Sequence, residues 1–229
     1  MAEWDRTDLL AKCRYEVGRP SVDEDNADAE WYHRLSRAQE HWVRTISRVI
    51  PAALWGDWAA MTASSSFYEV PDSLLNAASF YEVCAIDVRD SATGMILEKD
   101  QYILEQKPAT AGNVRPRIRL PYNRSFSFSP FCRVVPMPPP ITASVDPTLT
   151  PHTARILLVY HAAASWAAKG ERHNPAPYIN KMQAAWLGDP SLPGDIGILG
   201  QLKELYAPGE LELGEYSGGN RWYRSVDFQ

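Results

Sequence analysis

The chain has 229 residues, of which 45% are hydrophobic and 22% charged, and its formal net charge at pH 7 is −5. This composition is typical of a globular protein that buries a core without disulfide staples. Cys13, Cys84 and Cys132 lie far apart and form no C-x-x-C pair, which argues against a disulfide framework or a zinc knuckle. The N-terminus lacks the pattern of a signal peptide, and no long apolar run occurs, so neither secretion nor a membrane span is expected.

Two helices are expected near the N-terminus. The first covers residues 7–17, with Thr7 as a good N-cap. An acidic turn at 22–28 follows, and its charge complements the dipole of the next helix. The apolar residues of 29–50 keep a spacing of three and four, which predicts a second helix with one buried stripe that ends before Pro51.

From residue 58 to residue 145 the apolar period changes to two, which is typical of strands. Strands are expected at 66–70, 80–88, 94–98 and 102–105, with a hairpin tip at 90–94. Ten of the 18 prolines fall between Pro108 and Pro151. Because proline donates no ladder hydrogen bond, the alternating segments 115–120 and 125–129 are expected to be edge strands or an extended arm, not the centre of a sheet.

Helical patterns return at residue 150, where Thr150 and Pro151 are typical of a helix start. Three helices are expected, at 150–170, 178–187 and 195–205. The predicted fold class is therefore α+β: a helical bundle from N- and C-terminal helices, with a β-rich insertion and an extended C-terminal arm. Its predicted parts are the N-terminal bundle helices (1–57), the β-rich, Pro-rich insertion (58–149), the C-terminal helices of the same bundle (150–207) and the tail (208–229).

The usual motifs of catalysis and cofactor binding are missing from the sequence. The acidic turn 23–28 begins like a calcium loop but lacks the glycine at its sixth position and the distant glutamate. His161 and His173 flank Glu171 across a helix end, a spacing that ordinary surface histidines explain better than a metal site. We therefore expect no catalytic residue, no metal and no cofactor, and an enzyme with an unrecognised site is the less favoured alternative.

Charge is divided unevenly along the chain. Residues 106–145 contain six basic residues and no acidic one, which leaves −11 for the rest. In a strand, Arg115, Arg117 and Arg119 would project from the same face. A candidate subunit or tail interface consists of Arg115, Arg117, Arg119, Arg124 and Arg133.

Three uses of this arginine-bearing stretch are open: contact with nucleic-acid phosphates, docking of an acidic protein, and solvated protection of a sheet edge. The negative overall charge disfavours general DNA binding. Docking is favoured, because the acidic turn 23–30 and the acidic tail of a neighbouring copy would complement the arginines. A repeated contact between unlike surfaces builds rings when the rotation closes.

The helix predicted at 29–50 carries a second basic stripe, which lies away from its apolar one. The candidate basic helix face consists of Arg37, Arg44 and Arg48. A solvated face supported by the pair Glu40 and Arg44 is the simpler interpretation of this stripe.

Several segments together resemble the head–tail connector adaptor (head completion) proteins of tailed bacteriophages, including the tubular adaptors of short-tailed phages. They are the start Thr7–Leu10 with Gly18–Pro20, the helix centre Leu35–Glu40, the entry Tyr68–Asp72 into the β-rich insertion and the alanine-rich stretch Tyr160–Ala164. The resemblance covers residues 1–75 and 150–205 as a pattern of elements, whereas 106–145 matches less clearly.

The resemblance implies a mechanical role as a virion structural protein. Such adaptors are made in the host cytoplasm and form a homo-oligomeric ring, typically dodecameric, beneath the portal protein in the neck of the virion. The ring extends a channel through which genomic DNA passes without sequence-specific binding, and it docks a tail, stopper or nozzle protein. A non-viral or non-neck oligomeric assembly or binding module is the alternative from another class.

The same resemblance assigns a role to the end of the chain. Trp222, Tyr223 and Phe228 follow a flexible stretch at 217–219 and would form an arm that docks on the portal or on a neighbouring subunit. Plain disorder of this tail is the alternative.

Overall fold

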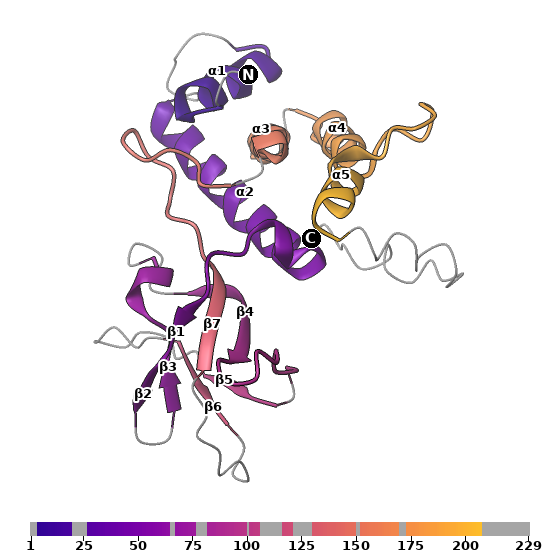
Figure 1. Cartoon of the computed structure of the whole chain (residues 1–229). Helices are drawn as coiled ribbons and strands as arrows, with labels where there is room; N and C mark the ends of the chain where they lie inside the picture. Colours follow the sequence, from indigo (N-terminus) through magenta and orange to yellow (C-terminus); the bar gives the residue numbers. More distant parts are fainter. Residues whose placement is uncertain are drawn as a thin grey trace.

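The computed structural model describes residues 4–19, 27–64, 67–76, 82–99, 101–105, 116–120, 130–149, 152–169 and 173–207. These residues form five α-helices and two antiparallel sheets (Figure 1), which confirms the α+β class. The predicted domain boundaries stay a prediction.

The helices come from both ends of the described chain and share one hydrophobic core. They are α1 (Arg6–Glu16), α2 (Asp28–Val49), α3 (Arg155–Ala168), α4 (Ala176–Leu187) and α5 (Gly197–Tyr206). Short 3-10 turns follow α2 at Pro51–Ala53 and precede α3 at His152–Ala154. In the core, the rings of Trp42 and Trp186 have centroids 5.1 Å apart, which joins α2 to α4.

The helices are arranged in a definite order across this core. α3 contacts α1, α2 and α4, and α5 packs on α4. Figure 1 shows α3 on one side of α2, with α4 and α5 beyond it. Because α3 is covered by other helices on several sides, its residues are mostly apolar, and many of its alanines are buried.

The sheets lie beside the C-terminal end of α2 (Figure 1). The first has the order β1-β7-β4, and the second β2-β3-β6-β5. The strands are β1 (Ala59–Ala60), β2 (Thr62–Ser64), β3 (Phe67–Glu69), β4 (Val83–Asp90), β5 (Ile103–Glu105), β6 (Arg117–Arg119) and β7 (Pro130–Pro136), and a 3-10 turn covers Asp72–Leu74. A second core, with Val88, Ile118 and Val134 at its centre, lies between them.

The expectation that segment 115–120 is an edge strand or an arm is wrong, because β6 lies between β3 and β5. Segment 125–129, which carries the same expectation, lies outside the described residues. The proline-bearing β7 is also central, between β1 and β4. The prolines stand where no ladder N–H is required: Pro130 and Pro136 are the ends of β7, and Pro116 precedes β6. The carbonyl oxygens of Pro116 and Pro130 still accept hydrogen bonds, from the backbone N–H groups of Val70 and Met61.

Some local expectations also need correction. Asp5, not Thr7, caps α1, because its side chain accepts a hydrogen bond from the backbone N–H of Asp8 at 2.8 Å. The expected strand at 94–98 contributes only an isolated bridge through Ile96. Thr150, the expected N-cap, lies outside the described residues.

The turn between α4 and α5 depends on two glycines with positive φ. A Cβ atom on Gly188 would lie 2.2 Å from the carbonyl oxygen of Asp195, and one on Gly197 would lie 2.2 Å from the backbone nitrogen of Gly188. Such approaches cannot be relieved without moving the backbone.

We therefore expect Gly188→Ala and Gly197→Ala to lower the free energy of unfolding by about 3 kcal/mol or more, as measured by urea denaturation. Gly194→Ala is the matched control, because Gly194 also has a positive φ but has no atom within 4 Å of the added Cβ. Gly194→Ala should lower the free energy of unfolding by only about 1 kcal/mol. Equal losses at all three positions would contradict the close packing of this turn.

Candidate functional site

After β7 the chain returns from the sheets to the helices across α2, in residues 137–149, the return segment. Two polar side chains of α2 hold it. The Ser36 hydroxyl accepts a hydrogen bond from the backbone N–H of Ile141 at 2.9 Å. Gln39, which is fully buried, accepts from the backbone N–H groups of Thr148 and Leu149 at 2.9 and 3.2 Å, and its amide donates to the carbonyl oxygen of Pro139 at 3.1 Å.

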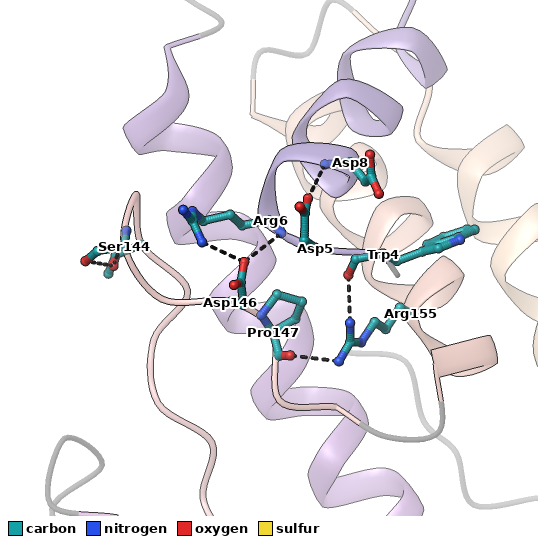
Figure 2. Close-up of polar contacts among 9 residues, drawn as sticks. Trp4, Asp5, Arg6, Asp8, Ser144, Asp146, Pro147 and Arg155 are labelled. Atoms are coloured by element: carbon teal, nitrogen blue, oxygen red, sulfur yellow. Dashed lines mark hydrogen bonds and ion pairs between the residues drawn. The ribbon is translucent and has the colours of Figure 1, made fainter. Parts of the chain in front are cut away.

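Arg155, the first residue of α3, ties the far end of the return segment to the N-terminus (Figure 2). Its side chain is only 7% exposed, and it donates to the carbonyl oxygens of Trp4, Pro147 and Leu149 at 2.8 to 2.9 Å. These three acceptors would otherwise need other donors in a largely buried place. One guanidinium therefore joins α3, the return segment and the residues that precede α1.

A surface ion pair lies beside this network (Figure 2). The Asp146 carboxylate accepts hydrogen bonds from the backbone N–H and the guanidinium of Arg6, at 3.1 and 2.8 Å. The backbone hydrogen bond, followed by the side-chain one, lowers the pKa of Asp146. Both side chains are substantially exposed, so the pair contributes little to stability.

Between α2 and the return segment lies a groove of about 930 Å³, the α2 groove. Its α2 residues lie on the side of the helix opposite the buried stripe that includes Trp31 and Leu35. Its lining consists of Asp28, Ala29, Tyr32, His33, Ser36, Arg37, Glu40, His41, Arg44, Pro140, Ile141, Thr142 and Ala143. This is the candidate functional site.

The charges at the two ends of the α2 groove are paired within the chain. Asp28 binds Arg14, and Arg44 binds Glu82 at 2.7 Å. Arg37 and Glu40, which lie between these ends, are exposed, and neither forms an ion pair with the part of the chain that the structure describes. The middle of the groove thus presents one charge of each sign beside an apolar wall.

His41 lies at the border between the α2 groove and the core. Its ring centroid is 4.9 Å from that of His161 on α3. Burial, and secondarily the nearby His41, lowers the pKa of His161 to about 4. Burial also lowers the pKa of His41, with a smaller contribution from Arg48. Both imidazoles are therefore neutral at pH 7.

The sequence did not reveal this histidine pair, because it joins two helices far apart in the chain. His173, the partner considered for His161, instead stacks on Trp166 with centroids 4.7 Å apart. Among the described residues, no group of three His, Cys, Asp or Glu side chains could hold a metal ion.

The candidate interface arginines have acidic partners in their own chain. Arg117 and Arg119 do project from the same face of β6, as predicted, and both bind Glu105 of β5, at 2.7 and 2.9 Å. The hydrogen bond from Arg117 is the largest of the effects that lower the pKa of Glu105. Arg133 of β7 binds Asp87 of β4 at 2.8 Å.

These pairs change the interpretation of the basic stretch. The guanidinium groups of Arg117, Arg119 and Arg133 are held by acids on neighbouring strands of the same chain. Arg115 and Arg124 lie outside the described residues, and so do Trp222, Tyr223 and Phe228 of the expected arm. Of the basic helix face, Arg37 and Arg44 line the α2 groove, and Arg48 is exposed near the end of α2.

An alternating stack of aromatic and guanidinium groups covers one face of the first sheet. Arg133 lies over the rings of Trp55 and Trp58, each at 4.8 Å, and Arg89 lies over Trp58 at 4.4 Å and over Phe131 at 5.6 Å. These contacts fix the two arginines by their flat faces. Sequence reasoning missed the stack, because it depends on the pairing of β4 with β7.

No helix in the described ranges is both long enough and apolar enough to cross a lipid bilayer.

Replacing Arg155 should destabilise the protein strongly, because three carbonyl oxygens lose their donor. We expect Arg155→Met to lower the free energy of unfolding by about 3 kcal/mol or more, as measured by urea denaturation. Arg6→Met, in the adjacent exposed pair, should cost at most about 1 kcal/mol. Similar losses for the two variants would show that Arg155 does not hold the return segment.

The partly buried His161 should make stability depend on pH. Its folded pKa of about 4 lies below the ordinary histidine pKa of 6.5, so the unfolded chain binds a proton first and stability falls as pH drops below 6.5. Between pH 7 and pH 5 this loss is about 2 kcal/mol. His161→Gln should remove that part of the slope in denaturation curves, whereas His33→Gln, on the exposed side of α2, should retain it. An unchanged slope in His161→Gln would contradict the assignment.

Comparisons with known proteins complete the description of the site. No protein-family model matches the chain, and no curated protein sequence matches it.

Proposed function

We propose that the chain is a head–tail adaptor of a tailed bacteriophage: a virion structural protein that forms a ring under the portal, extends the DNA channel and docks the tail. The proposal is supported by the order of the elements. Helices from both ends of the chain share one core, with the sheets inserted between them. That order is the one that the resemblance of residues 1–75 and 150–205 implies.

One observation carries the proposal: the helical part has two different outer faces, each suited to contact. One face has the α2 groove. The other, the α4–α5 face, exposes large apolar side chains, up to 71% exposed for Leu205; they are Leu187, Leu192, Ile196, Leu205 and Tyr206. Exposed apolar surface marks interaction sites, and a contact between unlike faces would repeat from copy to copy, closing into a ring when the rotation allows.

The charge arrangement supports a channel that lets DNA pass. Arg44, Arg117, Arg119 and Arg133 are paired with acidic side chains of the same chain. Tight DNA binding needs cations that neutralise phosphates and release counterions. Because the net charge is −5 and these arginines are already paired, DNA is expected to slide through the channel and not to be held in it.

The α4–α5 face also favours the second candidate, an oligomeric assembly module outside a virion neck. Both proposals require self-association, and only the adaptor requires a place in the virion. Imaging virions of the phage that encodes the chain, after labelling the chain, separates the two. Density at the neck supports the adaptor, and absence of the chain from purified virions overturns it.

Self-association itself is testable on the purified protein. We expect Leu192→Glu combined with Leu205→Glu to weaken assembly at least tenfold, because the charges would have to be buried in the contact. Size-exclusion chromatography with light scattering measures this, and unfolding curves should stay near those of the wild type, since both side chains are exposed. Met95→Glu, an exposed apolar position beside the sheets, is the matched control. A monomeric wild type that binds no portal ring would overturn both proposals.

A further inference from the structure

We propose that the C-terminal segment, residues 208–229, binds in the α2 groove of the neighbouring copy, with Trp222 and Tyr223 as its anchors. This inference rests on the proposed function, because it requires copies placed side by side in a ring. It specifies which faces meet: the α4–α5 face of one copy and the α2 groove of the next.

The order of the helices places the start of the segment on the side of the molecule opposite the α2 groove. The return segment lies on one side of α2, while α3 and then α4 and α5 lie on the other (Figure 1). The α2 groove is lined by α2 and the return segment. The described chain ends just after α5, at Ala207. When copies stack in the same orientation, the α5 of one copy therefore faces the α2 groove of the next.

The α2 groove has room for aromatic anchors. Its volume of about 930 Å³ is at the upper end of the range of small-ligand pockets, and its length along α2 runs from Asp28 to Arg44. Tyr32, Pro140 and Ala143 supply aromatic and apolar surface on both sides. Tryptophan and tyrosine gain the most when they fill such a place, because they bury large areas while fixing few rotatable bonds.

The charges of the segment complement those that the groove leaves unpaired. Glu40 in the middle of the groove forms no ion pair with described residues, and the anchors Trp222 and Tyr223 are flanked by Arg221 and Arg224. Arg37, one turn away on α2, has the opposite charge to Asp227, which follows the anchors in the sequence. The segment thus brings both signs of charge to a groove that presents both.

The length of the segment permits this contact. Residues 208–229 can span up to about 70 Å when fully extended, more than the width of one helical layer. The segment is polar and contains glycine, so the entropy lost when it is fixed in the groove must be offset by the anchors. Because the segment binds in the groove of a neighbouring copy, its anchors hold the two copies together.

Photo-crosslinking tests the location and the partner together. Tyr223 is replaced by p-benzoylphenylalanine, which keeps an aromatic side chain, and the labelled protein is mixed with ¹⁵N-labelled wild-type chain before assembly. We expect crosslinked peptides from residues 28–44 or 140–143, joined to the chain of the other isotope. Crosslinks within one chain, crosslinks to other surfaces, or none in assembled protein would overturn the inference.

Blocking the α2 groove gives an independent readout. Ala143→Trp fills the groove from the return segment, and Ser144→Trp places the same side chain on the next residue, which is exposed and does not line it. We expect at least a tenfold loss of assembly and of the crosslink for Ala143→Trp, and neither for Ser144→Trp. A chain that stops after Ala207 should show the same loss of assembly as Ala143→Trp.

The outcomes separate this inference from the proposed function. If the wild type assembles but Ala143→Trp and the shortened chain assemble equally well, the groove contact is wrong and the adaptor proposal stands. If the wild type neither assembles nor enters virions, the adaptor proposal fails, and the inference fails with it.

Discussion

The rest of the structure depends on the hydrogen bonds that hold the return segment, residues 137–149, in place; together these bonds form a clamp. Gln39 and Ser36 of α2 hold the middle of the segment, and Arg155 holds its end against α3 and the N-terminus. Burying these polar groups costs free energy unless each finds a partner, and here they satisfy one another. The clamp brings the chain from the sheets back into the helical core, and the same segment supplies the second wall of the α2 groove.

The second structural constraint is that the two cores are joined through one strand. Val134 belongs to the core of the sheets, and the next residue, Val135, belongs to the core of the helices. Successive side chains of a strand point to opposite sides, so β7 serves both cores at once. The ion pair between Arg44 and Glu82 and the contact of α2 with β4 add to this junction. A load applied to the sheets would therefore reach α2 directly, as the proposed mechanical role requires.

Much of the helical part could be predicted from the sequence, because a period of 3.6 and local stop signals are properties of short segments. The position of strands within a sheet could not, since it depends on pairing. A proline shows where a ladder N–H is missing, but β7 keeps its prolines at its two ends and remains central. The partners of the arginines were missed for the same reason: Glu105 lies opposite Arg117, and Asp87 opposite Arg133, only in the observed register. The α2 groove could not be predicted either, because it depends on contacts between residues about 100 positions apart, such as Ser36 and Ile141.

The paired arginines also change what the negative charge means for assembly. Cross-strand ion pairs at a partly exposed surface add little stability, but they fix long side chains and leave fewer cations to attract wrong partners. In the proposed ring, attraction between copies has to come from other surfaces, and these are apolar on the α4–α5 face and mixed in the α2 groove. When unlike surfaces lie on opposite sides of one helical layer, the contact between copies is head-to-tail and therefore has a direction. A directed contact can close into a ring of defined handedness, whereas a self-complementary patch would stop at a dimer.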